Sequence, residues 1–173
     1  MNKRNIILIG MPGAGKSSVG VILAKVLGYE FIDTDLVIQH REKRLLREII
    51  ADEGNEGFLA IENEVNATLE ADKSVIAPGG SAIYGKEAME HFKEIGTIVY
   101  LKLSYEDLAK RLGNLKGRGV VLKEGQTLKD LYDERSKLYE QYAEITVDES
   151  GRDIQGTILA LSLIHISEPT RRS

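Results

Sequence analysis

The segment from Gly10 to Ser17, GMPGAGKS, constrains the fold more than any other part of the chain. It matches the pattern G-x-x-x-x-G-K-[ST] and stands between an apolar run, Ile6 to Ile9, and a helix-like stretch from Ser18. Glycines let successive backbone N–H groups turn inward around a phosphate, and the N-terminus of the following helix adds partial positive charge. The order strand, loop, helix therefore predicts a P-loop rather than a glycine-rich turn with an exposed lysine.

Two side chains of this loop carry its expected chemistry. Lys16 can reach the β- and γ-phosphates of a nucleotide as a mobile point charge. The Ser17 hydroxyl can bind the magnesium ion that bridges those phosphates. The loop therefore predicts ATP and Mg²⁺ as ligands.

The composition indicates one soluble domain with a sizeable core. Of the 173 residues, 42% are hydrophobic and 29% are charged, and the net charge of -4 gives no basic surface for nucleic acid or an anionic membrane. The absence of cysteine excludes disulfides, thiolate catalysis and cysteine-ligated zinc. No apolar run approaches the length of a membrane span. We expect a cytoplasmic monomer with a small-molecule substrate and neither nucleic-acid nor membrane partners.

Strand-like and helix-like segments alternate along the chain, which is typical of a parallel sheet with helices on both faces. We expect a three-layer α/β P-loop NTPase fold with about five strands, in a single domain over residues 1–161. The helical stretch at about 36–69, with a turn at 53–57, is longer than a direct crossover needs and is interpreted as a substrate flap. The last segment, 162–173 (SLIHISEPTRRS), breaks the helical pattern, resembles translated sequencing-adapter sequence and is excluded from the fold as a non-native tail.

Acidic residues and glycines follow two of the expected strands. Asp33 and Asp35 follow the carboxyl end of the strand at 29–32, and Gly79 and Gly80 follow the strand at 74–77. Ligands of open α/β sheets bind at the carboxyl ends of strands, so these positions are candidate site residues. The alternatives are that either aspartate caps the next helix and that the glycines form a tight turn.

Two basic residues are further candidates. Arg118 lies in a glycine-rich loop, 113–119, within a candidate lid at about 113–125, where it can stabilise charge on a transferring phosphoryl group. Arg135 stands among apolar residues of a helix at 127–143, so its stem is expected to pack while its guanidinium projects inward or along the edge. A solvated loop and a surface ion pair are the respective alternatives.

In this order, the motifs resemble those of the shikimate kinase family over roughly residues 5–148. The resemblance implies that residues 13–18, which are Gly13, Ala14, Gly15, Lys16, Ser17 and Ser18, hold the ATP phosphates. It implies that Ser17 binds Mg²⁺ directly and Asp33 through water, that Asp35 contacts substrate hydroxyls, and that Gly79 and Gly80 border the substrate. It further implies that Arg118 is the lid arginine, that Arg111 lies near the adenine, and that Arg135 binds the substrate carboxylate.

The chain departs from the family pattern at two positions. The family has Phe-Arg-x-x-Glu in the flap, whereas this chain has Phe58-Leu59-Ala60-Ile61-Glu62, and it has a third glycine where this chain has Ser81. A charge-assisted hydrogen bond is worth about 1.5–3 kcal/mol, so losing the arginine is expected to weaken carboxylate binding roughly ten- to a hundredfold. Arg44 or Arg47 is a candidate to compensate.

The expected reaction is therefore transfer of the ATP γ-phosphoryl group to a hydroxyl of shikimate, giving shikimate 3-phosphate, with Lys16, Asp35 and Arg118 as catalytic residues. Two alternatives stay open. Leu59 supports a kinase of another small hydroxylated metabolite. The second alternative is a module that binds ATP without phosphoryl transfer. The residues expected to carry out the transfer are intact and argue against it: Lys16, Ser17, Asp35 and Arg118.

Overall fold

The computed structural model describes residues 4–113, 125–150 and 153–166. Within these residues, five strands form one parallel sheet in the order β2-β3-β1-β4-β5. The strands are β1 (Asn5–Ile9), β2 (Glu30–Asp33), β3 (Ser74–Ala77), β4 (Gly96–Lys102) and β5 (Ile145–Asp148). Because β1 lies at the centre, the loop that follows it opens at the middle of the sheet's carboxyl edge, where the strand order reverses.

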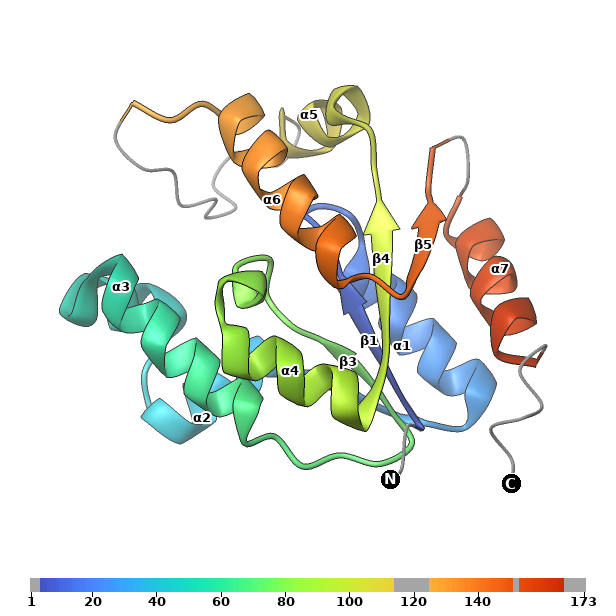
Figure 1. Ribbon diagram of the computed structural model, residues 1–173, viewed down its shortest axis with the longest axis horizontal. Helices are drawn as coiled ribbons and strands as arrows, with labels where there is room; N and C mark the ends of the chain where they lie inside the picture. The colour runs from blue at the N-terminus through green and yellow to red at the C-terminus, as the bar shows by residue number, and fades with distance from the viewer. Residues whose placement is uncertain (1–3, 114–124, 151–152, 167–173) are drawn as a thin grey trace.

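Seven α-helices and one 3₁₀ helix join the strands in the described part of the chain. They are α1 (Lys16–Leu27), α2 (Thr34–Glu42), α3 (Leu46–Ala67), η1 (Ala82–Tyr84), α4 (Lys86–Ile95), α5 (Tyr105–Gly113), α6 (Leu128–Tyr142) and α7 (Ile154–Ile166). Helices α1 and α7 cover one face of the sheet, and α4 and α6 cover the other (Figure 1). The expected three-layer fold is confirmed.

The alternation of side chains along β1 builds both layers. Ile6 and Leu8 belong to the buried cluster under α1 and α7, whereas Ile7 and Ile9 pack with Phe92 of α4 and with residues of α6. Side chains of a strand point alternately to opposite faces, so an apolar run without polar residues fits a strand buried on both sides. The composition of β1 therefore fits a strand in the interior of the sheet.

The segment of α2 and α3 projects from one side of the sheet (Figure 1). It has its own buried cluster, made by Ile38, Ile49, Phe58 and Val65. The turn expected at 53–57 is narrower than predicted, because α3 is interrupted only at Gly54, whose φ of 74° and ψ of 175° are non-helical. Glycine adopts this positive φ without a Cβ penalty, so the helix resumes at once.

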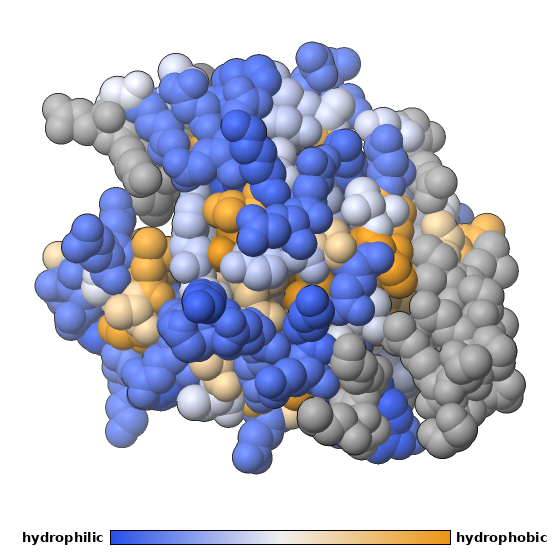
Figure 2. Space-filling model, viewed as in Figure 1, coloured by the Kyte–Doolittle hydropathy of each residue, from blue (hydrophilic) through white to orange (hydrophobic). Residues whose placement is uncertain are grey.

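The end of α7 also differs from the expectation. The helix continues to Ile166, past the expected end at 161, and the sequence has no glycine or proline between 162 and 166 to stop it. Residues 167–173 of the expected tail lie outside the described residues. Among the described helices, none combines the length and apolar character that a membrane crossing requires. Hydrophilic side chains cover most of the face in Figure 2, with apolar side chains showing between them.

Candidate active site

The P-loop joins the central strand β1 to α1. Gly13 and Gly15 have φ values of 93° and 81°, and Gly15 is the N-cap of α1 without a side-chain cap. The first turn of a helix presents backbone N–H groups that its own carbonyls do not accept from, and the helix dipole favours an anion there. The loop geometry fits a phosphate.

Two cations contact the backbone of this loop. Lys16 donates from Nζ to the carbonyl oxygens of Gly10 and Met11, at 2.7 and 3.0 Å. Arg111, at the end of α5, donates from Nη1 to the Gly13 carbonyl at 3.0 Å. Both cations therefore stand beside the place where the loop would hold phosphates.

The ends of β2 and β3 bring the acidic residues to the glycines. Asp33 pairs in register with Ala77, and the Asp35 carboxyl group lies beside Gly79. Asp33 accepts a hydrogen bond from the backbone N–H of Asp35 at 2.9 Å and is the N-cap of α2. The capping alternative is thus realised for Asp33, which leaves Asp35 free of that role.

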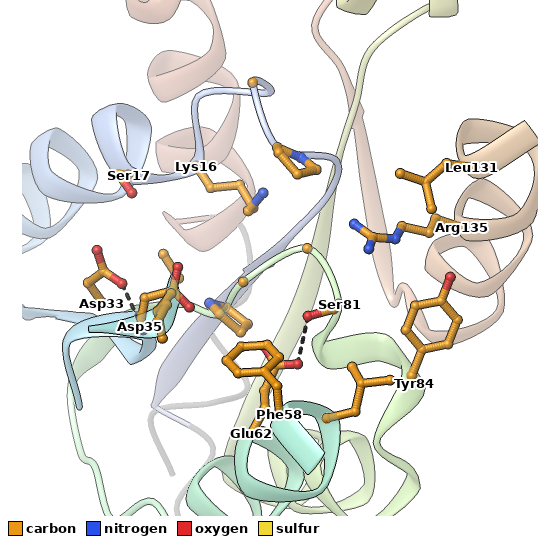
Figure 3. A pocket seen from close by; sticks show the side chains of 18 of the residues that line it. Lys16, Ser17, Asp33, Asp35, Phe58, Glu62, Ser81, Tyr84, Leu131 and Arg135 are labelled. Carbon is orange, nitrogen blue, oxygen red and sulfur yellow. Dashed lines mark hydrogen bonds between the residues drawn. The ribbon is translucent and has the colours of Figure 1, made fainter. Parts of the chain in front are cut away.

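A cavity of ≈ 490 Å³ opens between the P-loop, the α2–α3 segment and α6. Figure 3 shows Lys16 above it, Asp33 and Asp35 on one side, and Arg135 and Tyr84 on the other. Ten of the predicted site residues line it: Gly13, Gly15, Lys16, Ser17, Ser18, Asp33, Asp35, Gly79, Gly80 and Arg135. Residues distant in sequence thus meet in one site.

A second cavity, also ≈ 490 Å³, lies on the other side of the P-loop. Gly15 and Ser18 line both cavities, and Ala14 and Arg111 line only this one. The loop therefore separates two spaces that one phosphate chain could connect. Arg118 and most of the candidate lid lie outside the described residues.

Burial changes the acidity of Asp35. Burial and, to a smaller extent, the neighbouring Asp33 charge raise its pKa to about 6, although Lys16 acts in the opposite direction. A carboxyl group with a pKa near the working pH can accept a proton and still release it. Asp35 is thus suited to general base chemistry.

Helix α6 places Arg135 at the far side of the cavity. Arg135 is 7% exposed, its guanidinium lies 5.6 Å from the centre of the Tyr84 ring, and Nε has no hydrogen-bond partner among the described residues. Tyr139 of the same helix donates to the Gly80 carbonyl at 2.8 Å, and a Cβ at Gly80 would lie 2.9 Å from Arg135 Nη1. A side chain at position 80 would crowd this guanidinium, so Gly80 leaves room for the cation beside the turn after β3.

Two buried acids had no predicted role. Glu62 of α3 is 1% exposed, and burial raises its pKa to about 7. Glu149, directly after β5, is 5% exposed and lines the second cavity, and burial raises its pKa to about 7 as well. Glu149 follows the carboxyl end of a strand, the signal that selected Asp33 and Asp35. Glu62 lies on a helix, and its signal is its match to the last residue of the flap pattern Phe-Arg-x-x-Glu.

The flap arginine of the family has no substitute among the two candidates. Leu59 lines the main cavity, and neither Arg44 nor Arg47 does. Arg44 instead forms ion pairs with Glu42, Asp52 and Glu53 at 3.0 to 3.2 Å. The cavity therefore has the apolar side chain of Leu59 where the family has an arginine.

Comparison with known proteins agrees with this geometry. The family model described as shikimate kinase matches residues 12–162. The chain belongs to the shikimate kinase family. Shikimate kinase 2 of Yersinia enterocolitica is 34% identical over 154 residues, which are 84% of this chain and 86% of that protein.

Solved structures of the family superpose over nearly the whole chain. Shikimate kinase from Acinetobacter baumannii in complex with shikimate has a TM-score of 0.84 and 31% identity, covering 95% of this chain and 94% of that one. The enzyme from Aquifex aeolicus has a TM-score of 0.74 and 29% identity, covering 95% and 99%. Thymidylate kinase from Candida albicans, 15% identical with a TM-score of 0.64, shares the fold.

Proposed function

We propose that this member of the shikimate kinase family transfers the γ-phosphoryl group of ATP to a ring hydroxyl of shikimate, giving shikimate 3-phosphate. The observation that carries the proposal is the main cavity, which places Asp35 and Arg135 on opposite sides with Lys16 above them. A carboxylated polyol suits this arrangement, because Arg135 can bind its carboxylate while Asp35 binds a hydroxyl.

The nucleotide would bind along the P-loop from one cavity to the other. The backbone at Gly13, Ala14 and Gly15 and the side chains of Lys16, Ser17 and Ser18 would hold the phosphates, and Arg111 would border the adenine. Family members use ATP with Mg²⁺. The hydroxyl of Ser17 and the carboxylate of Asp33 are hard oxygen donors that suit Mg²⁺, Asp33 through water. When bound, Mg²⁺ neutralises charge on the phosphates.

The residues around the acceptor supply the general base and orient the reacting hydroxyl. The hydroxyl oxygen attacks the γ-phosphorus, the bond from that phosphorus to the bridging oxygen breaks, ADP leaves, and Asp35 accepts the hydroxyl proton. The backbone at Gly79 and Gly80 borders the acceptor, and Arg135 holds its carboxylate, so the reacting hydroxyl is fixed relative to Asp35. Lys16 stabilises the charge that spreads over the transferring group.

We also propose a catalytic role for Arg118 and a cytoplasmic monomer. The family resemblance and the loop composition support Arg118 as the lid cation that stabilises the transferring group. Multi-angle light scattering with and without ATP tests the monomer, and Arg118→Ala, with Arg47→Ala as the exposed control, tests the lid.

The direct experiment measures ADP release by the purified protein with ATP and Mg²⁺. Shikimate at millimolar concentration should raise the rate far above the rate without it, and phosphorus NMR should show a new phosphate monoester. A rate that does not change with shikimate rejects the substrate. The same assay with a panel of hydroxy acids and neutral polyols then identifies the acceptor.

The second candidate is a kinase of another small hydroxylated metabolite, and Leu59 favours it. An acceptor without a carboxylate gains nothing from a flap arginine and loses nothing to a leucine. Its signature is a higher kcat/KM for a neutral polyol than for shikimate in the same assay.

A further inference from the structure

A second carboxyl group faces the acceptor cavity, and the proposed reaction does not use it. Glu62 accepts a hydrogen bond at Oε1 from the Ser81 hydroxyl at 2.7 Å (Figure 3). Its other oxygen, Oε2, is buried and has no hydrogen-bond partner among the described residues, although Glu62 lines the cavity. An unpaired buried polar atom costs about 1–3 kcal/mol, so a donor from a ligand at this point would be stabilising.

Glu62 and Asp35 flank the same backbone position. A Cβ on Gly79 would lie 3.0 Å from Asp35 Oδ1 and 3.1 Å from Glu62 Oε2. The two oxygens are therefore within about 6 Å of each other, close enough for their charges to interact. Two hydroxyls on neighbouring carbons of one ring can each donate to one of these oxygens.

The surrounding charges favour a neutral donor. Lys16 acts electrostatically on Asp35, and Arg135 acts on Glu62, so each carboxyl group already faces a cation. A cationic ligand group between the two carboxyl groups would be repelled by both Lys16 and Arg135. A hydroxyl donates a hydrogen bond without adding charge.

Ser81 fixes the orientation of Glu62. With Oε1 held by the Ser81 hydroxyl, Oε2 cannot rotate away from the cavity without losing that hydrogen bond. Ser81 belongs to the turn after β3 and Glu62 to α3, so the contact also ties the α2–α3 segment to the sheet edge.

We propose that Glu62 is a further substrate-contacting residue, whose Oε2 accepts a hydrogen bond from a second ring hydroxyl next to the one that Asp35 orients. Ser81 is its positioning residue. The inference rests on the proposed function and deepens it, because the site then selects a polyol with neighbouring hydroxyls rather than a simple alcohol.

The test pairs protein variants with substrate analogues. Shikimate is compared with two analogues, each lacking one of the ring hydroxyls that stay unphosphorylated, using wild type, Glu62→Met and Ser81→Ala. In the wild type, removal of the contacting hydroxyl should lower kcat/KM about tenfold. In Glu62→Met the same removal should have no effect, and in Ser81→Ala the effect should shrink while the KM for ATP stays unchanged.

Three controls keep the result interpretable. Ser81→Thr keeps the hydroxyl and should restore the wild-type discrimination. Glu90→Gln, on the exposed side of α4, should retain it. Thermal unfolding checks that each variant is folded. If Glu62→Met does not fold, the result for Ser81→Ala alone tests the role of Glu62.

The outcomes separate this inference from the proposed function. Equal losses on hydroxyl removal in the wild type and in both variants overturn the role of Glu62 while leaving shikimate as substrate. If the wild type neither binds shikimate in calorimetry nor phosphorylates it, the proposed function fails and the inference falls with it.

Discussion

Lys16 Nζ lies 2.7 Å from the carbonyl oxygen of Gly10, so the P-loop lysine is held by the backbone of its own loop. A nucleotide that enters the loop must draw this ammonium group onto its phosphates. The contact keeps the cation in place and ready, because a carbonyl oxygen competes less well for it than a phosphate does.

Lys16→Met should therefore lower shikimate-dependent ADP release about 100- to 1,000-fold, the usual effect of removing one stabilising donor for transition-state charge. Lys25→Met, at an exposed position of the same helix, is the matched control and should keep full activity. A Lys16→Met variant that turns over at the wild-type rate would contradict a nucleotide site in this loop.

Asp35→Asn should lower kcat with shikimate about 10²- to 10⁴-fold, because the amide cannot accept the hydroxyl proton. The surface residue Asp133, paired with Lys129 at 2.7 Å, provides the control Asp133→Asn, which should be neutral.

The pH profile gives a second measure of the same residue. The pKa of Asp35 is about 6 and that of Glu62 about 7, so kcat/KM for shikimate should fall as the pH drops through this range and Asp35 becomes protonated. The two groups interact, so the apparent pKa values belong to the pair. In Asp35→Asn only Glu62 of this pair still titrates, so the acid limb of the residual activity should shift, and a limb that survives unchanged would assign it to another group.

The sequence predicts the residues whose role follows from local position. The P-loop is predicted by its motif. The acids after β2 and the glycines after β3 are predicted because the carboxyl ends of parallel strands share one edge, and neither step needs side-chain packing. Arg135 needed the family resemblance, since a lone arginine on a helix has no local signal. In the structure Arg135 is buried and lines the main cavity.

Glu62 and Arg44 show where local reasoning ends. The environment of Glu62 depends on Ser81, which is distant in sequence and adjacent only after α3 packs on the sheet edge. Arg44 is near the flap in sequence, but three carboxylates engage it outside the cavity. Tertiary packing decides which charged side chains face the ligand.

Leu59→Arg should improve the use of shikimate, lowering its KM about ten- to a hundredfold, because a guanidinium at this cavity position can pair with the acceptor carboxylate. Leu59→Met changes shape without adding charge and should leave the KM within a few-fold. Use of a neutral polyol should not improve in Leu59→Arg. If Leu59→Arg and Leu59→Met behave alike towards shikimate, the carboxylate does not lie near this position.

Glu62 should also make the stability of the ligand-free protein depend on pH. Burial raises its pKa from 4.5 to about 7, so the folded state keeps a proton that the unfolded chain releases near pH 4.5. Between these values the folded state binds more protons, and this contribution makes stability fall as the pH rises, by about 3 kcal/mol in all.

In Glu62→Gln this contribution is absent, while the amide oxygen can still accept the Ser81 hydrogen bond. From pH 5 to pH 8, the wild type should therefore lose stability relative to Glu62→Gln, by up to about 3 kcal/mol in the free energy of unfolding measured in urea. Glu90→Gln, at an exposed position, should follow the wild type. Parallel curves for the wild type and Glu62→Gln would mean that Glu62 is already ionised at pH 5, because only a group that stays protonated in the folded state produces the divergence.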